Sequence, residues 1–229
     1  MTPEQKGDYV SVTISYISDL LLQAQKSGFN VPDHVLRMAD KSARYAEHIS
    51  KAATFDGLTG LYDVDVIRQI GEDTVENNRR ANGKGVSVIF IDLDGFKEVN
   101  DTYEHKAGNA ALRSFGRILR KLRETDISAG RYGGDEFLVV LPDTDYQGAI
   151  EAEKRIRDAF EYRKARYLHM LGKRFPQTDL DKVRGLSYSA GIASAETSCA
   201  SFDELKQRAD AAMYKAKKSG KKGVAVSDS

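Results

Sequence analysis

Two short segments of the chain combine carboxylates with glycines, which is what a site for phosphate or metal requires. The first is Ile-Asp-Leu-Asp-Gly-Phe-Lys at residues 91–97. A β-branched apolar run precedes it, so Asp92 is predicted at the carboxyl end of a buried strand, where α/β proteins place ligand sites. The following turn would offer the backbone N–H groups of Gly95 and Phe96 to the oxygens of a triphosphate. Helix capping by Asp94 is the alternative explanation of this pattern.

The second segment is Arg-Tyr-Gly-Gly-Asp-Glu-Phe at residues 131–137. Adjacent glycines between two strand-like runs predict a tight hairpin turn with positive φ, which would expose Asp135 and Glu136 at its tip. An antiparallel arm beside the first strand would bring Asp135 next to Asp92. Because like charges repel, we expect a divalent cation between them, and oxygen ligands without Cys or His favour Mg²⁺ or Mn²⁺. Two solvated acids on an exposed turn are the alternative.

The elements that must position these residues follow from hydrophobic periodicity after residue 55. Helix-like and strand-like segments alternate, which predicts an α/β domain. The segment 162–183 has no clear period and is interpreted as an insertion of unknown role. The predicted helices are 64–80, 96–123, 145–165 and 202–218, and the predicted strands are 86–92, 127–132, 136–141, 184–194 and 223–227.

Residues 1–54 are predicted to form a helical hairpin. Apolar residues recur in steps of three and four on both sides of a break at Gly28, Asn30 and Pro32, which suit the end of one helix and the start of another. Such a hairpin would have a broad apolar face. This face either packs on the following domain or mates with a second copy of the chain.

Composition excludes several classes of protein. The 229 residues include 35 Lys plus Arg and 34 Asp plus Glu, a net charge of +1, so no global field attracts DNA, RNA or an anionic membrane. The apolar runs are far shorter than the roughly 18 residues of a membrane-spanning helix, and no secretory signal is evident, so a cytoplasmic location without membrane insertion is expected. The single cysteine, Cys199, excludes an internal disulfide and a thiolate metal cluster.

Four ordered motifs together resemble the GGDEF domain of diguanylate cyclases. The resemblance covers about residues 55–227 and leaves 1–54 outside it. It implies a nucleotidyl-cyclase, palm-like domain over 55–229, with a central, mostly antiparallel sheet flanked by helices, after a helical dimerisation or regulatory segment at 1–54. The motifs are Asp-x-Leu-Thr-Gly-Leu at 56–61, Asp-Leu-Asp-Gly-Phe-Lys-x-x-Asn-Asp at 92–101, the 131–137 segment, and Ala209-Asp210 through Ala216-Lys217.

The resemblance implies a homodimer that condenses two GTP into cyclic di-GMP, with each 3′-hydroxyl attacking the α-phosphate of the other nucleotide and pyrophosphate leaving. Asp92, the backbone carbonyl of Leu93 and Asp135 would bind Mg²⁺ or Mn²⁺. Asp135 would also accept the hydroxyl proton, and Lys97 would stabilise the transition state. Glu136 would support either the metal site or the hairpin.

The resemblance also implies nucleotide contacts. Lys217 and Lys221 would hold the terminal phosphates, while Asn100 and His105 would contact the nucleotide at its guanosine end. Asn109 stands where the family usually has Asp, whose two acceptor oxygens match the N1–H and N2–H donors of guanine. A carboxamide presents one acceptor and one donor, so we expect relaxed purine selectivity, with ATP accepted and cyclic GMP-AMP as a further product.

The resemblance also suggests a site for inhibition by the product. In the family, the cyclic dinucleotide binds an Arg-x-x-Asp motif before the glycine pair. Arg123 and Asp126 form this motif, but Asp126 lies one residue farther from Gly133 than usual. One added residue reverses the direction of a strand side chain, unless a bulge restores it. Arg155 is the candidate secondary contact, and whether the inhibitory site is intact stays open.

The alternative to an enzyme is a catalytically silent module that binds GTP or cyclic di-GMP and signals through a partner. The acids Asp92, Asp135 and Glu136 and the amine of Lys97 are all present, and their presence favours the enzyme. The signal sensed by residues 1–54 is not evident from their sequence.

Overall fold

The chain divides into two compact units, Met1–Asp56 and Gly57–Ser229. A computed structural model describes residues 17, 19–32, 35–40, 42, 54–81, 85–122, 127–174, 185–195, 201–220 and 223–227. Within the first unit, helix covers 19–26 and 35–40. Between them Gly28 has φ +89°, a conformation that side-chain-bearing residues rarely adopt, which explains the break at this position.

Several apolar side chains of the first unit are exposed. Ile17, Leu20 and Leu22 are between 44% and 48% exposed, and Met38 is 67% exposed. No helix in the described ranges is both long and apolar enough to cross a bilayer.

The second unit is built on a five-stranded sheet with the strand order β2-β3-β1-β4-β5. Neighbouring strands are antiparallel except β4 and β5, which are parallel, so the predicted mostly antiparallel sheet is confirmed. The strands are β1 (Val86–Asp94), β2 (Ser128–Arg131), β3 (Glu136–Pro142), β4 (Ser187–Ala195) and β5 (Val224–Val226).

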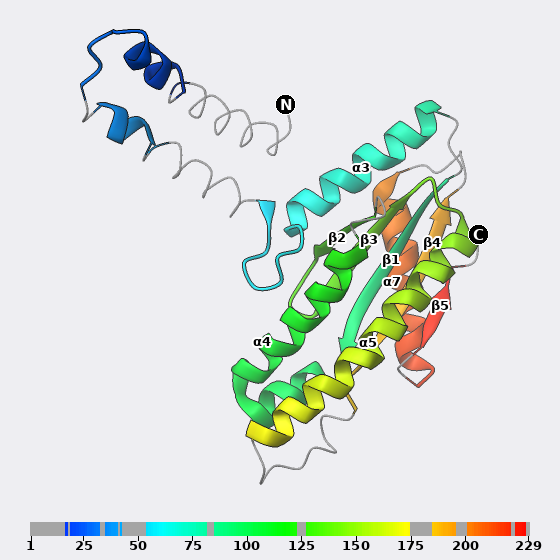
Figure 1. Cartoon of the computed structure of the whole chain (residues 1–229). Helices are drawn as coiled ribbons and strands as arrows, with labels where there is room; N and C mark the ends of the chain where they lie inside the picture. The colour runs from blue at the N-terminus through cyan, green and yellow to red at the C-terminus, as the bar shows by residue number, and fades with distance from the viewer. Residues whose placement is uncertain are drawn as a thin grey trace. The chain divides into compact units, whose positions relative to one another are not determined.

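Among the described residues of this unit, four helices cover the two faces of the sheet (Figure 1). Helices α3 and α7 pack on one face, and α4 and α5 pack on the other. The helices are α3 (Val64–Ala81), α4 (Phe96–Leu122), α5 (Tyr146–Arg174) and α7 (Phe202–Lys218).

Strand β1 is the centre of the fold, since every one of its residues is buried. Ile89 and Ile91 join the apolar cluster under α4 and α5, whereas Val88 and Phe90 join the cluster under α3 and α7. This alternation follows from the period of two in a strand. A strand buried on both faces accounts for the continuous apolar run in the sequence.

Helix α5 is longer than its sequence predicts. It ends at Arg174 rather than near 165, so the first half of the predicted insertion 162–183 is helix. Tyr167 and Leu171 are buried one helical turn apart. Lys164 interrupts the apolar spacing that leads to them, which conceals the helix from a periodicity analysis. Its side chain is nevertheless only 13% exposed, because a lysine stem can lie along apolar surface.

Gly191 allows α7 to approach the sheet. A Cβ on Gly191 would overlap the carbonyl oxygen of Ala209 and the amide nitrogen of Met213, both backbone atoms of α7. We therefore expect Gly191→Ala to lower the free energy of unfolding by about 3 kcal/mol, because α7 would have to move. Chemical denaturation of both proteins measures this difference in the free energy of unfolding. Gly57→Ala is the matched control, since a Cβ there meets no atom within 4 Å; equal stability of the two variants would contradict the prediction.

Candidate active site

The register of β1 places polar side chains in one row across the sheet. Asp92 lies opposite Glu136 of β3 on one side and Ser189 of β4 on the other. Their position in the alternation directs them to the face covered by α3 and α7. Asp135 directly precedes β3, and its backbone carbonyl accepts a hydrogen bond of 3.2 Å from the N–H of Leu93. Two neighbouring strands thus bring Asp92 and Asp135 side by side.

The second aspartate of β1 is held by β4. Asp94 is 4% exposed, and its carboxylate accepts hydrogen bonds from the hydroxyls of Ser187 at 3.1 Å and Ser189 at 2.9 Å. Gly95 follows with φ +76°, and α4 begins at Phe96. The last residue of β1 is therefore held in place just before the chain turns into α4. The first N–H groups of α4 have no carbonyl partner within the helix.

Lys217 supplies the positive charge of this acidic row. It lies in the last turn of α7, and its Nζ is 2.6 Å from Asp92 Oδ1. Burial raises the pKa of Asp92, whereas the hydrogen bond and charge of Lys217 oppose that rise. Burial likewise raises the pKa of Glu136, and the neighbouring charges of Asp92 and Asp135 raise it further. The site is a partly desolvated group of carboxylates with one ammonium in contact.

The turn between β2 and β3 differs from its prediction. Neither Gly133 nor Gly134 has positive φ, so the expectation of a turn with positive φ was wrong. A Cβ on Gly134 would meet no atom within 4 Å, whereas Gly133 lies close to Glu136. A Cβ on Gly133 would stand 2.6 Å from a carboxylate oxygen of Glu136. Arg131 donates through Nε to the Gly133 carbonyl at 3.1 Å and through Nη2 to the Gly134 carbonyl at 2.6 Å.

Helix α4 carries the residues predicted to contact the nucleotide. Lys97 and His105 are exposed, and Asn100 and Asn109 are half-buried. A Cβ on Gly108 would overlap the side-chain oxygen of Asn100, although eight residues of straight helix span about 12 Å. Helix α4 is therefore bent between these two residues, as Figure 1 shows near its N-terminal end. The bend brings Asn100 next to the turn that bears Asn109.

Three predicted site residues lie outside the described residues. These are Lys221 and the two members of the proposed inhibitory motif, Arg123 and Asp126. Arg155, the candidate secondary contact, is exposed on α5. The interpretation of these residues stays a prediction.

The oxygen atoms of this site fit a divalent cation that is also coordinated by water or by phosphate oxygens. In the part of the chain that the structure describes, no three His, Cys, Asp or Glu residues are grouped so as to hold a metal ion. Asp92, Asp135 and the Leu93 carbonyl nevertheless offer hard oxygens at one place. Mg²⁺ is commonly held by one or two carboxylates together with water and substrate phosphates. The ammonium of Lys217 in contact with Asp92 also shows that this carboxylate accepts a cation.

Comparison with known proteins decides the family. Residues 53–223 match the family described as diguanylate cyclase, GGDEF domain. The chain belongs to the GGDEF family. The resemblance inferred from its four motifs is thereby confirmed, and diguanylate cyclases of this family generally use a divalent metal.

Individual GGDEF proteins are similar over most of the chain. The probable diguanylate cyclase DgcC of Escherichia coli K12 is 33% identical over 82% of this chain and 47% of its own length. The diguanylate cyclase DgcS of Shewanella oneidensis MR-1 is 34% identical over 79% of this chain and 55% of its own length. The chain thus spans about half the length of these relatives. A solved structure describing an interaction between a microbial GGDEF domain and cyclic di-GMP has 28% identity and a TM-score of 0.60, covering 78% of this chain and 99% of that one.

Sequence reasoning missed the residues that support the acids. Ser187 and Ser189 alternate with apolar residues in β4, and polar residues at every second position of a buried strand were the available signal. Arg131 stands at the start of the glycine motif, but its bonds to the turn carbonyls depend on the folded hairpin. Asp210 of α7 also contributes to the raised pKa of Glu136, after burial, Asp92 and Asp135.

The contact between Lys217 and Asp92 predicts how the protein without nucleotide binds metal. Lys217→Met should raise its affinity for Mn²⁺ about tenfold, because a cation then no longer competes with the ammonium for Asp92. Electron paramagnetic resonance of free Mn²⁺ measures this affinity. Lys218→Met removes the same charge one residue further on, from an ammonium 4.5 Å from the ring of Tyr214. Equal Mn²⁺ affinities of the two variants would contradict competition at Asp92.

Proposed function

We propose that this GGDEF protein condenses two GTP into cyclic di-GMP and two pyrophosphates. The supporting observation is the pair formed by Asp92 on β1 and Asp135 just before β3, with the ammonium of Lys217 2.6 Å from Asp92. An ammonium in that position can exchange a carboxylate oxygen for a phosphate oxygen when a nucleotide arrives. The relatives DgcC and DgcS carry the name diguanylate cyclase, which supports the same activity.

In the proposed reaction, the 3′-oxygen of each GTP forms a bond to the α-phosphorus of the other. Each new bond breaks the bond from that phosphorus to the bridging oxygen, and pyrophosphate leaves. Asp135 accepts the hydroxyl proton, since it lies beside Asp92 at the tip of the hairpin. Lys97, exposed on the first turn of α4, offsets the negative charge that develops on the phosphate. Glu136, opposite Asp92 on β3, supports either the metal site or the hairpin.

The proposed metal is Mg²⁺, with Mn²⁺ as its substitute. Asp92, Asp135 and the carbonyl of Leu93 would hold it. When bound, it would neutralise the acids and act as a Lewis acid toward the phosphate oxygens. Lys217, displaced from Asp92, would then bind the terminal phosphates together with Lys221.

The proposed active form is a homodimer, because one nucleotide site cannot close a ring of two nucleotides. The exposed apolar side chains of the first unit, among them Ile17, Leu20 and Leu22, support a role of residues 1–54 in bringing two GGDEF units together. The activity per chain should therefore rise with protein concentration.

Product analysis tests the activity. With GTP and Mg²⁺, we expect the purified chain to release pyrophosphate and form cyclic di-GMP, identified by mass spectrometry. Asp135→Asn should slow product formation by at least about a hundredfold, because a positioned general base contributes that much or more. Asp158→Asn on the exposed side of α5 is the matched control and should leave the rate unchanged.

A chain that binds GTP tightly but releases no pyrophosphate at high protein concentration would contradict the cyclase. That outcome would favour the silent binding module. Full activity of Asp135→Asn would instead contradict the assigned base.

We also propose relaxed purine selectivity, with cyclic GMP-AMP as a second product from mixed nucleotides. The observation that favours it is the bend of α4, which brings Asn100 next to the turn bearing Asn109. Two carboxamides, those of Asn100 and Asn109, would then face the base. An aspartate at position 109 would instead match the two N–H donors of guanine. An amide instead fits the N1 acceptor and N6 donor of adenine as well.

Asn109→Asp should restore preference for guanine. We expect the ratio of cyclic di-GMP to cyclic GMP-AMP from equimolar GTP and ATP to rise about tenfold or more, as expected for one bidentate base contact. Mass spectrometry of the products measures this ratio. Asn77→Asp on the exposed side of α3 makes the same chemical change away from the site. Exclusive cyclic di-GMP formation by the unmodified chain would contradict relaxed selectivity.

A further inference from the structure

We propose that Tyr167, on the long C-terminal part of α5, is a positioning residue for base recognition. It acts by holding the bend of α4 that brings Asn100 and Asn109 together. The inference rests on the proposed nucleotide site and assigns a role to the first half of the segment 162–183.

The hydroxyl of Tyr167 links α5 to the bend. It donates a hydrogen bond of 3.0 Å to the backbone carbonyl of Ala107, sixty residues earlier in the chain. Tyr167 is 7% exposed, and burial raises its pKa well above the ordinary value, with a further rise from Tyr103. The hydroxyl therefore stays protonated and remains a donor at physiological pH.

The carbonyl that accepts this hydrogen bond lies at the bend of α4. Ala107 directly precedes Gly108, on which the side chain of Asn100 rests, and Asn109 follows. Tyr103, which lies between Asn100 and Gly108 in α4, is close enough to Tyr167 to raise the pKa of its hydroxyl. The Tyr167 side chain thus lies beside the bent part of α4.

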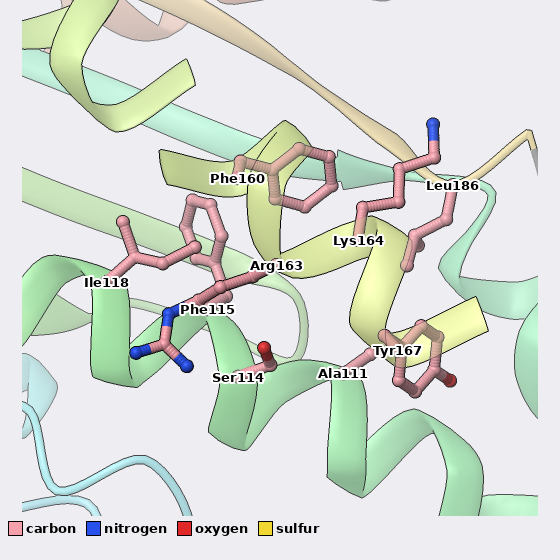
Figure 2. Close-up of a pocket in the computed structure, with 9 residues that line it drawn as sticks. All are labelled: Ala111, Ser114, Phe115, Ile118, Phe160, Arg163, Lys164, Tyr167 and Leu186. Atoms are coloured by element: carbon pink, nitrogen blue, oxygen red, sulfur yellow. The ribbon is translucent and has the colours of Figure 1, made fainter. Parts of the chain in front are cut away.

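Apolar packing keeps Tyr167 in place. Leu171 is 1% exposed, and Leu168 is partly buried against the same apolar cluster, which also contains Val99 and Ala107. Figure 2 shows Tyr167 beside Ala111, at the edge of a cavity between α4 and α5.

A small cavity lies between α4 and α5 next to this hydrogen bond. Ser114 and Arg163 line it from opposite helices (Figure 2), while Phe115 and Phe160, with ring centroids 5.8 Å apart, join the two helices there. The Tyr167 hydrogen bond adds a directional contact to this apolar packing at the bend of α4.

Loss of the hydroxyl should weaken recognition of the base and spare the phosphate contacts. Lys217 and the acids lie on the opposite face of the sheet and are untouched by Tyr167. A hydrogen bond of this kind is worth about three- to tenfold in an equilibrium constant. Tyr167→Phe should therefore weaken binding of a guanosine nucleotide by about that factor.

The experiment measures binding, so that it does not depend on turnover. The full chain is titrated calorimetrically, with Mg²⁺, against the α,β-methylene analogues of GTP and of ATP. Tyr167→Phe should weaken the GTP analogue and lower the preference for it over the ATP analogue. Its kcat at saturating GTP should change less than its KM.

Two tyrosines of the same unit provide matched controls. Tyr162→Phe removes a hydroxyl from α5 at a side chain that is 71% exposed. Tyr188→Phe removes a buried hydroxyl that donates to Glu153 of α5 at 2.9 Å. The second variant should lower the melting temperature without changing nucleotide preference, which separates positioning from stability.

Unchanged affinity and unchanged preference in Tyr167→Phe would overturn the proposal. So would equal losses in Tyr167→Phe and Tyr188→Phe, since these would indicate a general loss of stability. A chain that binds the GTP analogue but does not turn over GTP contradicts the proposed activity and leaves the Tyr167 comparison intact. A chain that binds neither analogue overturns both.

Discussion

The antiparallel pairing of β1 with β3 and β4 buries Asp92 and Asp94 beside the half-buried Glu136, and the site depends on how that charge is stabilised. Asp92 lies opposite Glu136 in a sheet covered on both faces. A buried carboxylate is unfavourable unless it is paired or hydrogen-bonded. In this structure Lys217 pairs with Asp92, and two serines of β4 hold Asp94. The lysine and the serines therefore stabilise the negative charge at this end of the sheet.

The acidic residues could be predicted from the sequence because their placement follows from local pattern. Asp92 ends an apolar run and Asp135 lies in the turn of a hairpin. Placing the two side by side requires only one assumption, that the two segments pair. The contact between Lys217 and Asp92 could not be predicted in this way. It depends on α7 crossing the sheet at a distance that Gly191 permits, and no pattern near Lys217 encodes that approach. The resemblance of the motifs, rather than the spacing of residues, identified this lysine.

Where the structure differs from what the sequence predicts, the differences have physical causes. Lys164 stands where the apolar stripe of α5 should continue, so the helix was predicted to end near 165, before Leu171. The bend of α4 places Asn100 against Gly108, a contact that straight-helix periodicity does not anticipate. Gly133 and Gly134 lack the expected positive φ, because a glycine in a sequence does not reveal whether its conformational freedom is used.

The sheet divides the proposed site into two halves that a nucleotide must connect. Asp92, Glu136 and Lys217 belong to the face of α3 and α7, whereas Asn100 and Asn109 belong to α4 on the other face. The chain passes between these faces at Gly95, whose φ of +76° permits a turn in a single residue. Because serine hydroxyls fix Asp94 immediately before that turn, the end of β1 has little freedom to move relative to β4. The positions of Asn100 and Asn109 relative to Asp92 and Lys217 are then set by the path of α4 after Gly95, so the contacts that define its bend would govern how these two amides meet the base.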